Sequence, residues 1–367
     1  MAKAGAMTGA LAVAVAMAGA LAVAVAMAVT EAMAVGLCFQ VLWSKGKMKD
    51  NSQNLRCSQT DAPVLVYGSL NVDYVYRVPH FLQPGETLHS LDRNVYAGGK
   101  GLNQAVALRR AGAQVRFLGA VGSQDGQLLV DTLKNEGIDL SLLKVREDMA
   151  SGHTFIQVDL NGQNCIMLYA GANHSHSRDE IVSALDGCAR GSWAVVQNET
   201  NDVAFFVEQA AARGVNVAIN VSPLGPQIDQ IPLEKCRVII VNEIEGAALS
   251  GHGADDNPDD MMASLRARFP NSLVVLTLGT SGSLAADGNG DDSPVCCAAF
   301  KADAVDTTAA GDTFFGYFIK YLSCGHTVAE SLTAASAASA IAVTRSGAAP
   351  SIPLAAETAA FLESHRQ

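Results

Sequence analysis

The stretch from Asp306 to Gly316, DTTAAGDTFFG, combines a turn of small residues with a carboxylate at a helix start. Ala309, Ala310 and Gly311 precede Asp312 and an apolar run that predicts a helix. The first turn of a helix leaves N–H groups unpaired and can hold an anion, and small residues let a phosphate approach the backbone. Asp312 could therefore take a proton from a hydroxyl that is being phosphorylated. An ordinary helix-start aspartate is an equally good interpretation of this stretch alone.

Two clusters in the first half of the chain have the residue types that bind hydroxyl groups. Asn71 and Asp73 follow a predicted strand, Val64–Tyr67, and on an extended segment they point the same way. An amide beside a carboxylate suits vicinal sugar hydroxyls, although both residues are also common turn formers. Residues 98–103, GGKGLN, allow close backbone approach, with Lys100 and Asn103 as polar partners. The alternative is a glycine-rich turn before a helix, and the spacing is not that of a Walker A loop.

Carboxylates and small polar residues also follow strands in the second half. Asn242 and Glu245 stand three apart at a predicted helix start, and Glu199 follows a strand. Carboxylates near a phosphate site commonly hold Mg²⁺ through water, although Asn242 and Glu245 also fit a capping pair. The run 277–282, TLGTSG, either contacts nucleotide phosphates or only turns the chain.

The elements that position these residues alternate between strand and helix, which predicts an α/β fold with a largely parallel, helix-covered sheet. Between residues 151 and 172 the pattern changes to two extended runs joined at Asn161-Gly162, a strong hairpin signal. With the segment near 74–97, this hairpin is expected to form a small sheet that covers the site as a lid. Two helices are expected to complete the chain after Asp312.

Composition excludes some classes of protein. The 367 residues carry a formal net charge of −11 with no long basic run in the folded part, which argues against nucleic acid as the main partner. The eight cysteines show no C-x-x-C pair, which indicates a reducing compartment.

The N-terminal part is different in composition from the rest. Residues 1–43 are rich in alanine and apolar, and residues 44–62 resemble a linker. A targeting segment, a membrane anchor and a low-complexity extension are the three interpretations, with the anchor the least favoured.

Six motifs occur in an order and spacing that resemble the ribokinases of the phosphofructokinase-B family of sugar kinases, over roughly residues 63–365. They are GSLNVD (68–73), GGKGLNQAVA (98–107), VNEIEG (241–246), TLGTSG (277–282), DTTAAGDTFFG (306–316) and AIAVTRSGAAPSIP (340–353). The resemblance implies a three-layer α/β/α fold with a small β-sheet lid. It also implies transfer of the γ-phosphoryl group of ATP to the 5-hydroxyl of D-ribose, giving ribose 5-phosphate.

The resemblance further assigns roles to individual positions. Asp312 matches the catalytic base, and the backbone of Ala309, Ala310 and Gly311 matches the anion hole. The sugar-binding positions are Asn71, Asp73, Gly99, Lys100, Asn103, Glu199 and Asp312. The nucleotide-binding positions are Asn242, Thr277, Gly279, Gly282 and Gly311, and Glu245 is linked indirectly to Mg²⁺. An activating K⁺ ion is expected at Asp306, Thr308, Ala342, Arg345, Gly347 and Ser351, in part through backbone carbonyls.

Other activities remain open from the residues alone. A related kinase that acts on fructose or adenosine and a non-catalytic sugar-binding regulator are the alternatives. The resemblance also implies a homodimer that forms through the lid. We expect a cytoplasmic location, or an organellar one if residues 1–43 target the protein, and membrane contact only if that segment is retained.

Overall fold

The computed structural model describes residues 62–288 and 293–365. The expected extension over residues 1–43, and all but the last residue of the expected linker over 44–62, lie outside the described residues. Within the described part, no helix has the length and apolar character needed to cross a membrane.

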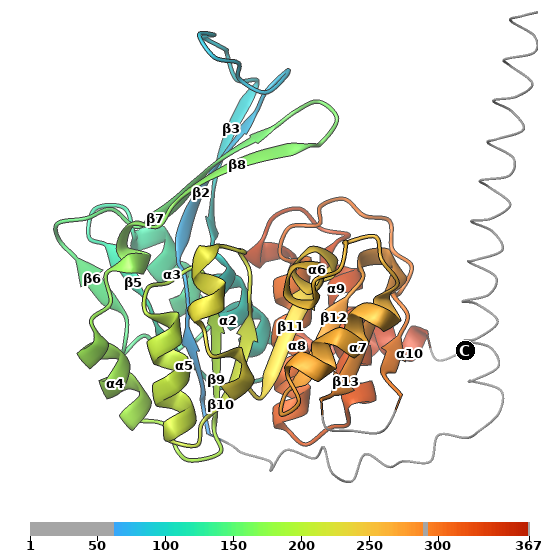
Figure 1. Cartoon of the computed structure of the whole chain (residues 1–367). Coiled ribbons are helices and arrows are strands. Elements are labelled where there is room, and N and C mark those ends of the chain that lie inside the picture. The colour runs from blue at the N-terminus through green and yellow to red at the C-terminus, as the bar shows by residue number, and fades with distance from the viewer. Residues whose placement is uncertain (1–61, 289–292, 366–367) are drawn as a thin grey trace, which may run out of the picture. The chain divides into compact units, whose positions relative to one another are not determined.

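In the described part the main sheet has eight strands in the order β14-β13-β12-β11-β10-β9-β1-β4 (Figure 1). Their bounds are β1 Val64–Tyr67, β4 Val115–Leu118, β9 Trp193–Gln197, β10 Asn216–Asn220, β11 Val238–Asn242, β12 Leu273–Thr277, β13 Ser283–Asp287 and β14 Val295–Cys297. The six strands from β4 to β12 in this order are parallel, so their carboxyl ends share one edge. The loops that carry the candidate residues after β1, β9, β11 and β12 therefore meet at that edge.

Helices cover both faces of this sheet, which explains why its strands are continuous apolar runs instead of alternating ones. One face packs against α2 Lys100–Arg110, α3 Gln127–Asn135, α8 Ala310–Ser323 and α9 Val328–Ala342. The other face packs against α4 Arg178–Asp186, α5 Val203–Ala212, α6 Glu243–Ser250 and α7 Pro258–Arg268. The predicted three-layer α/β/α architecture is confirmed.

A second sheet of four strands, in the order β3-β2-β7-β8, extends away from the helix-covered layers (Figure 1). We call it the small sheet. Its strands are β2 Asn71–Arg77, β3 Asp92–Gly98, β7 Gly152–Val158 and β8 Asn164–Tyr169. The turn at Asn161-Gly162 joins β7 and β8, with Gly162 at a φ of 78°, so the predicted hairpin is present. A shorter pair, β5 Ala120–Gly122 and β6 Lys144–Arg146, lies beside it.

The C-terminal half contains elements that the sequence analysis did not predict. A third helix, α10 Ala355–Ser364, follows α9, whereas two helices were expected to complete the chain. β13 and β14 add an antiparallel edge to the main sheet. β13 and β14 are short, with five and three residues, and they follow a polar turn and a proline, so their apolar pattern is weak.

Candidate active site

Asp312 lies in the first turn of α8, with 7% of its surface exposed. Asn103 Nδ2 donates a hydrogen bond to Asp312 Oδ2 at 3.0 Å, and Gln104 Nε2 donates to Oδ1 at 2.9 Å. Both donors are neutral amides, so they fix the carboxylate without forming an ion pair. Asn103 Oδ1 is buried and has no hydrogen-bond partner among the described residues, which leaves it able to accept from a hydroxyl.

Close packing of α2 against α8 sets the distance between the carboxylate and its donors. A Cβ added at Gly316 would lie 2.4 Å from the Cβ of Ala107, closer than two carbon atoms can approach. Gly316 is one helical turn after Asp312, and Ala107 is one turn after Asn103, so both pairs share the contacting faces. The small residues therefore let the two helices approach until the amides reach the carboxylate.

The N-terminus of α8 opens onto free space beside Gly311. A Cβ added at Gly311 would meet no atom within 4 Å. Ala309 has the left-handed φ of 60° at the N-cap, and the Ala310 N–H donates to Thr307 O at 3.2 Å. The Ala310 N–H already donates a hydrogen bond within the turn. In this arrangement the Gly311 N–H is therefore the first donor that the predicted anion hole could use. The helix dipole adds partial positive charge at the same place.

Asp73 lies on β2, opposite the glycine-rich turn. Thr154 Oγ1 donates to Asp73 Oδ1 at 2.6 Å, and a Cβ added at Gly98 would lie 1.9 Å from Asp73 Oδ2. Glycine is therefore required at position 98 for the carboxylate to occupy this place. Burial raises the pKa of Asp73 to about 6, the Thr154 hydrogen bond opposes the rise, and the charge of Glu199 adds to it.

Glu199 connects the loop after β9 to the start of α2. Ser69 Oγ donates to Glu199 Oε2, and the Lys100 N–H donates to the same oxygen at 3.2 Å. Burial raises the pKa of Glu199, against the opposing charge of Lys100. Burial alone would lower the pKa of the Lys100 ammonium, but nearby carboxylates outweigh it and raise that pKa above its ordinary value: Asp312, Glu199 and Glu245. The structure thus brings together charged residues from four distant parts of the sequence.

Asn71 is held by a residue outside the predicted motifs. Asn173 Nδ2 donates to Asn71 Oδ1 at 2.8 Å, while Asn173 Oδ1 accepts from the Leu70 N–H at 2.9 Å. Asn173 lies in the 3₁₀ helix η2, Gly171–His174, directly after β8. This contact fixes the base of the small sheet to the end of β1.

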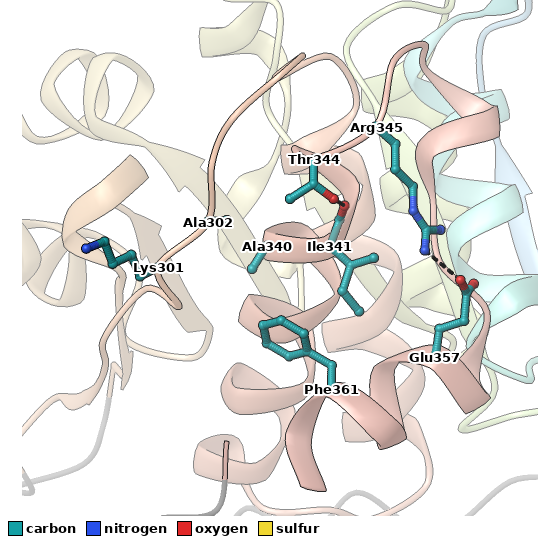
Figure 2. A pocket seen from close by; sticks show the side chains of 8 residues that line it. All are labelled: Lys301, Ala302, Ala340, Ile341, Thr344, Arg345, Glu357 and Phe361. Atoms are coloured by element: carbon teal, nitrogen blue, oxygen red, sulfur yellow. Dashed lines mark hydrogen bonds and ion pairs between the residues drawn. The ribbon is translucent and has the colours of Figure 1, made fainter. Parts of the chain in front are cut away.

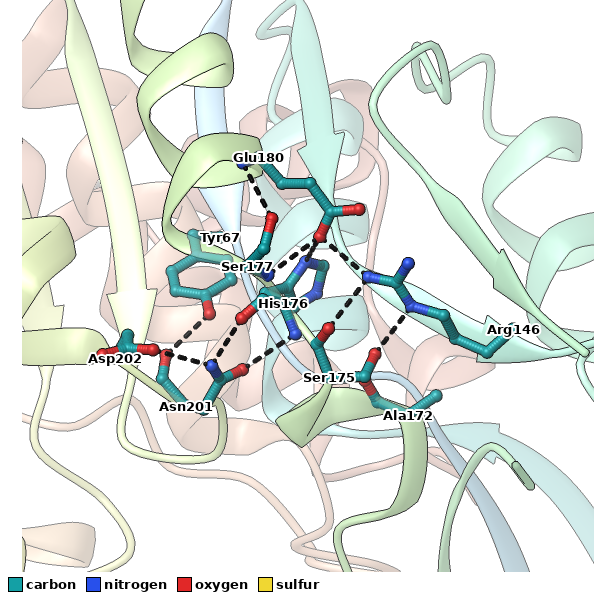
Figure 3. A network of polar contacts seen from close by, with 9 residues as sticks. All are labelled: Tyr67, Arg146, Ala172, Ser175, His176, Ser177, Glu180, Asn201 and Asp202. Atoms are coloured by element: carbon teal, nitrogen blue, oxygen red, sulfur yellow. Dashed lines mark hydrogen bonds and ion pairs between the residues drawn. The ribbon is translucent and has the colours of Figure 1, made fainter. Parts of the chain in front are cut away.

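A polar network behind η2 extends this connection (Figure 3). Arg146 donates to Ser175 Oγ at 2.8 Å and to Glu180 Oε2 at 2.8 Å. Asn201 and His176 exchange two hydrogen bonds, with Asn201 Nδ2 donating to His176 O at 2.8 Å and His176 N donating to Asn201 Oδ1 at 3.1 Å. Because Asn201 is two residues after Glu199, the network couples the end of the small sheet to the loop that carries Glu199. Burial lowers the pKa of His176 to about 4, so its ring is neutral at pH 7.

The predicted nucleotide-binding residues lie on neighbouring strands. Asn242 ends β11 and is the register partner of Thr277, which ends β12. Asn242 and Glu245 form a reciprocal capping box, in which Glu245 N donates to Asn242 Oδ1 at 2.9 Å and Asn242 N donates to Glu245 Oε2 at 3.1 Å. The capping interpretation is therefore realised, and it places the Glu245 carboxylate at the sheet edge that the loop residues share. Gly279 and Gly282 both have positive φ, 50° and 102°.

The predicted cation-binding residues form a compact loop pair. Asp306 Oδ1 accepts from the Thr308 N–H at 2.9 Å, and Asp306 Oδ2 accepts from the Gly347 N–H at 2.9 Å. Burial raises the pKa of Asp306, but the Thr308 and Gly347 hydrogen bonds outweigh it and lower the pKa below its ordinary range. The Ser351 Oγ donates to Ala348 O at 2.8 Å within the same segment.

The Arg345 side chain points away from this loop. It forms an ion pair with Glu357 at 2.5 Å, beside a cavity of about 340 Å³ that Phe361 and Thr344 also line (Figure 2). A cation at Asp306 would therefore meet Arg345 through its backbone. Within residues 62–288 and 293–365, no three histidine, cysteine, aspartate or glutamate side chains gather as a metal cluster.

Four contact residues were not anticipated from the sequence: Ser69, Gln104, Thr154 and Asn173. Gln104 and Ser69 lie inside the motifs GGKGLNQAVA and GSLNVD, so the motifs themselves could have drawn attention to them. Thr154 and Asn173 lie in or beside the predicted hairpin, where nothing in the local pattern separates them from other polar residues.

Comparison with known proteins gives one consistent result. The model of the pfkB family of carbohydrate kinases matches residues 61–355. The chain is 36% identical over 303 residues to a ribokinase of Haemophilus influenzae, which covers 81% of this chain and 97% of that protein. Among solved structures, a ribokinase of Thermotoga maritima has a TM-score of 0.73 at 32% identity and covers 82% of this chain and 99% of its own. An Arabidopsis thaliana ribokinase complexed with ribose and ATP has a TM-score of 0.74 at 26% identity, with 82% and 98% covered.

Proposed function

The chain belongs to the pfkB family of carbohydrate kinases, and we propose that it transfers the γ-phosphoryl group of ATP to the 5-hydroxyl of D-ribose. The alignments with two relatives named ribokinase each span 97% of the relative, and one related structure is complexed with ribose and ATP. The observation that carries the proposal is the buried Asp312 carboxylate, held by two amides beside the open N-terminus of α8.

The sugar would bind between the small sheet and the start of α2. Asp73 and Asn71 would hold the ring hydroxyls, and Asn103 Oδ1, buried without a partner in the described part, would accept from another hydroxyl. Lys100 and Glu199 would also contact the sugar. Gly99, with a φ of 96°, lets the backbone turn closely around it. The 5-hydroxyl would then face Asp312, which removes its proton as the phosphoryl group arrives.

The nucleotide would lie along the edge formed by Asn242, Thr277, Gly279 and Gly282, with its γ-phosphoryl group at Gly311. Kinases of this kind use a divalent cation, usually Mg²⁺, which neutralises phosphate charge when it is bound with ATP. Glu245 would hold it indirectly, since its carboxylate oxygens already accept from Asn242. We further propose that K⁺ binds beside Asp306 and fixes the shape of the anion hole without contacting ATP.

The small sheet would act as a lid that excludes water from the transferred group. It also exposes apolar side chains that share one face, namely Tyr96 at 38%, Ile166 at 56% and Leu168 at 44%. We propose that a second copy of the chain covers them in a homodimer. Analytical ultracentrifugation should show a dimer for the wild type and a monomer for Ile166→Lys, and a monomeric wild type would contradict the proposal.

The proposed cytoplasmic location rests on the sequence, whose eight cysteines show no C-x-x-C pair. An organellar location and membrane contact both depend on residues 1–43 and stay predictions.

The central test is a substrate panel of ribose, deoxyribose, fructose and adenosine with ATP, each with potassium or sodium. We expect the highest kcat/KM for ribose and a marked loss of activity when sodium replaces potassium. A preference for adenosine would contradict the proposed substrate. In the same assay Asp312→Asn should abolish turnover while ribose binding, measured by calorimetry, persists. An active Asp312→Asn enzyme would contradict the proposed base.

A further inference from the structure

We propose that Gln104 and Gln197 form an amide relay that positions the Asp312 carboxylate, an inference that rests on the proposed role of Asp312 as the base. Gln104 Nε2 donates to Asp312 Oδ1 at 2.9 Å, and Gln197 Nε2 donates to Gln104 Oε1 at 2.7 Å. Both glutamine residues have no exposed surface. The relay joins three elements, because Asp312 is on α8, Gln104 on α2 and Gln197 at the end of β9.

The chemistry of the carboxylate determines the direction of both amides. An ionised carboxylate only accepts hydrogen bonds, so Gln104 must turn its NH₂ group toward Asp312. Its carbonyl oxygen then faces away and needs a donor, which the Gln197 NH₂ group supplies. Gln197 therefore acts on the carboxylate through Gln104 alone, since it makes no hydrogen bond to Asp312 within the described residues.

This arrangement leaves one polar atom of Gln197 without a hydrogen bond in the described part. Its Oε1 is buried without a hydrogen-bond partner in the described part, and a Cβ added at Gly68 would lie 2.7 Å from it. A buried unpaired carbonyl is unfavourable, and the reversed amide would leave Gln104 Oε1 unpaired beside the base. The orientation seen here thus satisfies Gln104 at the expense of Gln197, as expected if the carboxylate is the group to be held in place.

The relay predicts an effect on kcat that a purely structural role of the two glutamines in packing would not produce. Gln104 and Asn103 each donate a hydrogen bond to one oxygen of Asp312. Without the Gln104 donor, only the hydrogen bond from Asn103 holds the carboxylate, which can then rotate. Misplacement of a catalytic group by about 1 Å can lower the rate by about a hundredfold. Binding of the sugar ring by residues on β2 would not change. The relay therefore affects kcat and leaves KM for ribose nearly unaltered.

The test uses the full-length protein with Gln104→Met, Gln197→Met and the double variant, since methionine preserves side-chain length and removes the amide. We expect Gln104→Met to lower kcat about ten- to a hundredfold, with KM for ribose and ATP within about twofold of wild type. Gln197→Met should lower kcat by a smaller factor. The double variant should be no slower than Gln104→Met, because Gln197 acts only through Gln104.

Gln127→Met is the matched control, because Gln127 also donates its amide to a carboxylate, Asp131, at 2.8 Å, but on the exposed surface of α3. It should leave kcat unchanged. Thermal unfolding and ribose binding of each variant show that the fold and the sugar site persist, and if Gln104→Met does not fold, Gln197→Met still tests the relay. A Gln104→Met enzyme with normal kcat, or a double variant in which the two losses multiply, would overturn the relay. Such a result together with an inactive Asp312→Asn would leave the proposed function intact, whereas an active Asp312→Asn would contradict the base itself.

Discussion

The raised pKa of Asp73 predicts that ribose affinity depends on pH near 6. Burial disfavours the charged carboxylate and raises its pKa to about 6, and the sugar hydroxyls would be held by the ionised form. At pH 7 most Asp73 side chains are ionised, and at pH 5 only about one in ten is. The Kd for ribose is therefore expected to rise about tenfold as the pH falls from 7 to 5. Isothermal titration calorimetry without nucleotide measures it directly.

The control separates Asp73 from its neighbour Glu199, whose pKa burial also raises. Asp73→Asn should bind ribose more weakly at pH 7 and should lose most of the pH dependence. A wild-type Kd that stays constant between pH 5 and 7 would refute the reasoning. So would an Asp73→Asn variant that keeps the full dependence, because the titrating group would then be another one.

The same pKa predicts the effect of Asp73 on stability. The folded state binds the proton more tightly than the unfolded state, whose aspartate has the ordinary value of 3.8. Stability therefore falls as the pH rises from about 4 to about 6, by up to about 3 kcal/mol for two pKa units. Asp73→Asn should raise the free energy of unfolding by about 1–3 kcal/mol at pH 7.5 and change it little at pH 4. Denaturant unfolding at the two pH values checks the sign.

Three further predictions concern the surroundings of the site. Gly98→Ala should weaken ribose binding at least tenfold with little change in KM for ATP, because the added Cβ would displace Asp73; steady-state kinetics with each substrate varied checks this. Asp306→Asn should reduce the stimulation by potassium, because the loop loses its anionic acceptor; activity across a potassium titration measures it. Arg146→Met should destabilise the protein by about 1–3 kcal/mol, because it leaves the Glu180 carboxylate without its partly buried partner; thermal unfolding is the measurement.

Local patterns predicted the parts of the fold that local chemistry determines. The Asn161-Gly162 turn between two extended runs predicted the hairpin, and the apolar runs predicted the buried parallel strands. Asp312 and Asn103 could each be selected from their own motifs. Their hydrogen bond joins residues 209 positions apart, and it depends on helix packing at Gly316 that no single window of sequence encodes.

What the sequence could not supply was the partners of the motif residues. Asn173 looks like any loop asparagine, and Gln197 like the polar end of a strand. Each acquires its role only when the fold brings it to Asn71 or Gln104. The sequence allows two roles for Asn242 and Glu245, a helix cap and a contact with the phosphates. The capping box is present, and it leaves the carboxylate at the sheet edge, so the two interpretations are compatible.

The charge balance of the site explains why cations belong to the proposed reaction. Four carboxylates lie within electrostatic reach of Lys100 or of one another, namely Asp73, Glu199, Glu245 and Asp312. With one ammonium group among them, the formal charge is −3 when all are ionised, and ATP brings further negative charge to the same place. The partial charge at the start of α8, about half a unit, is too small to offset this repulsion. A divalent cation carried with the nucleotide and a monovalent cation beside Asp306 would supply the missing positive charge, which makes the potassium and sodium comparison a test of the electrostatics as well as of the loop.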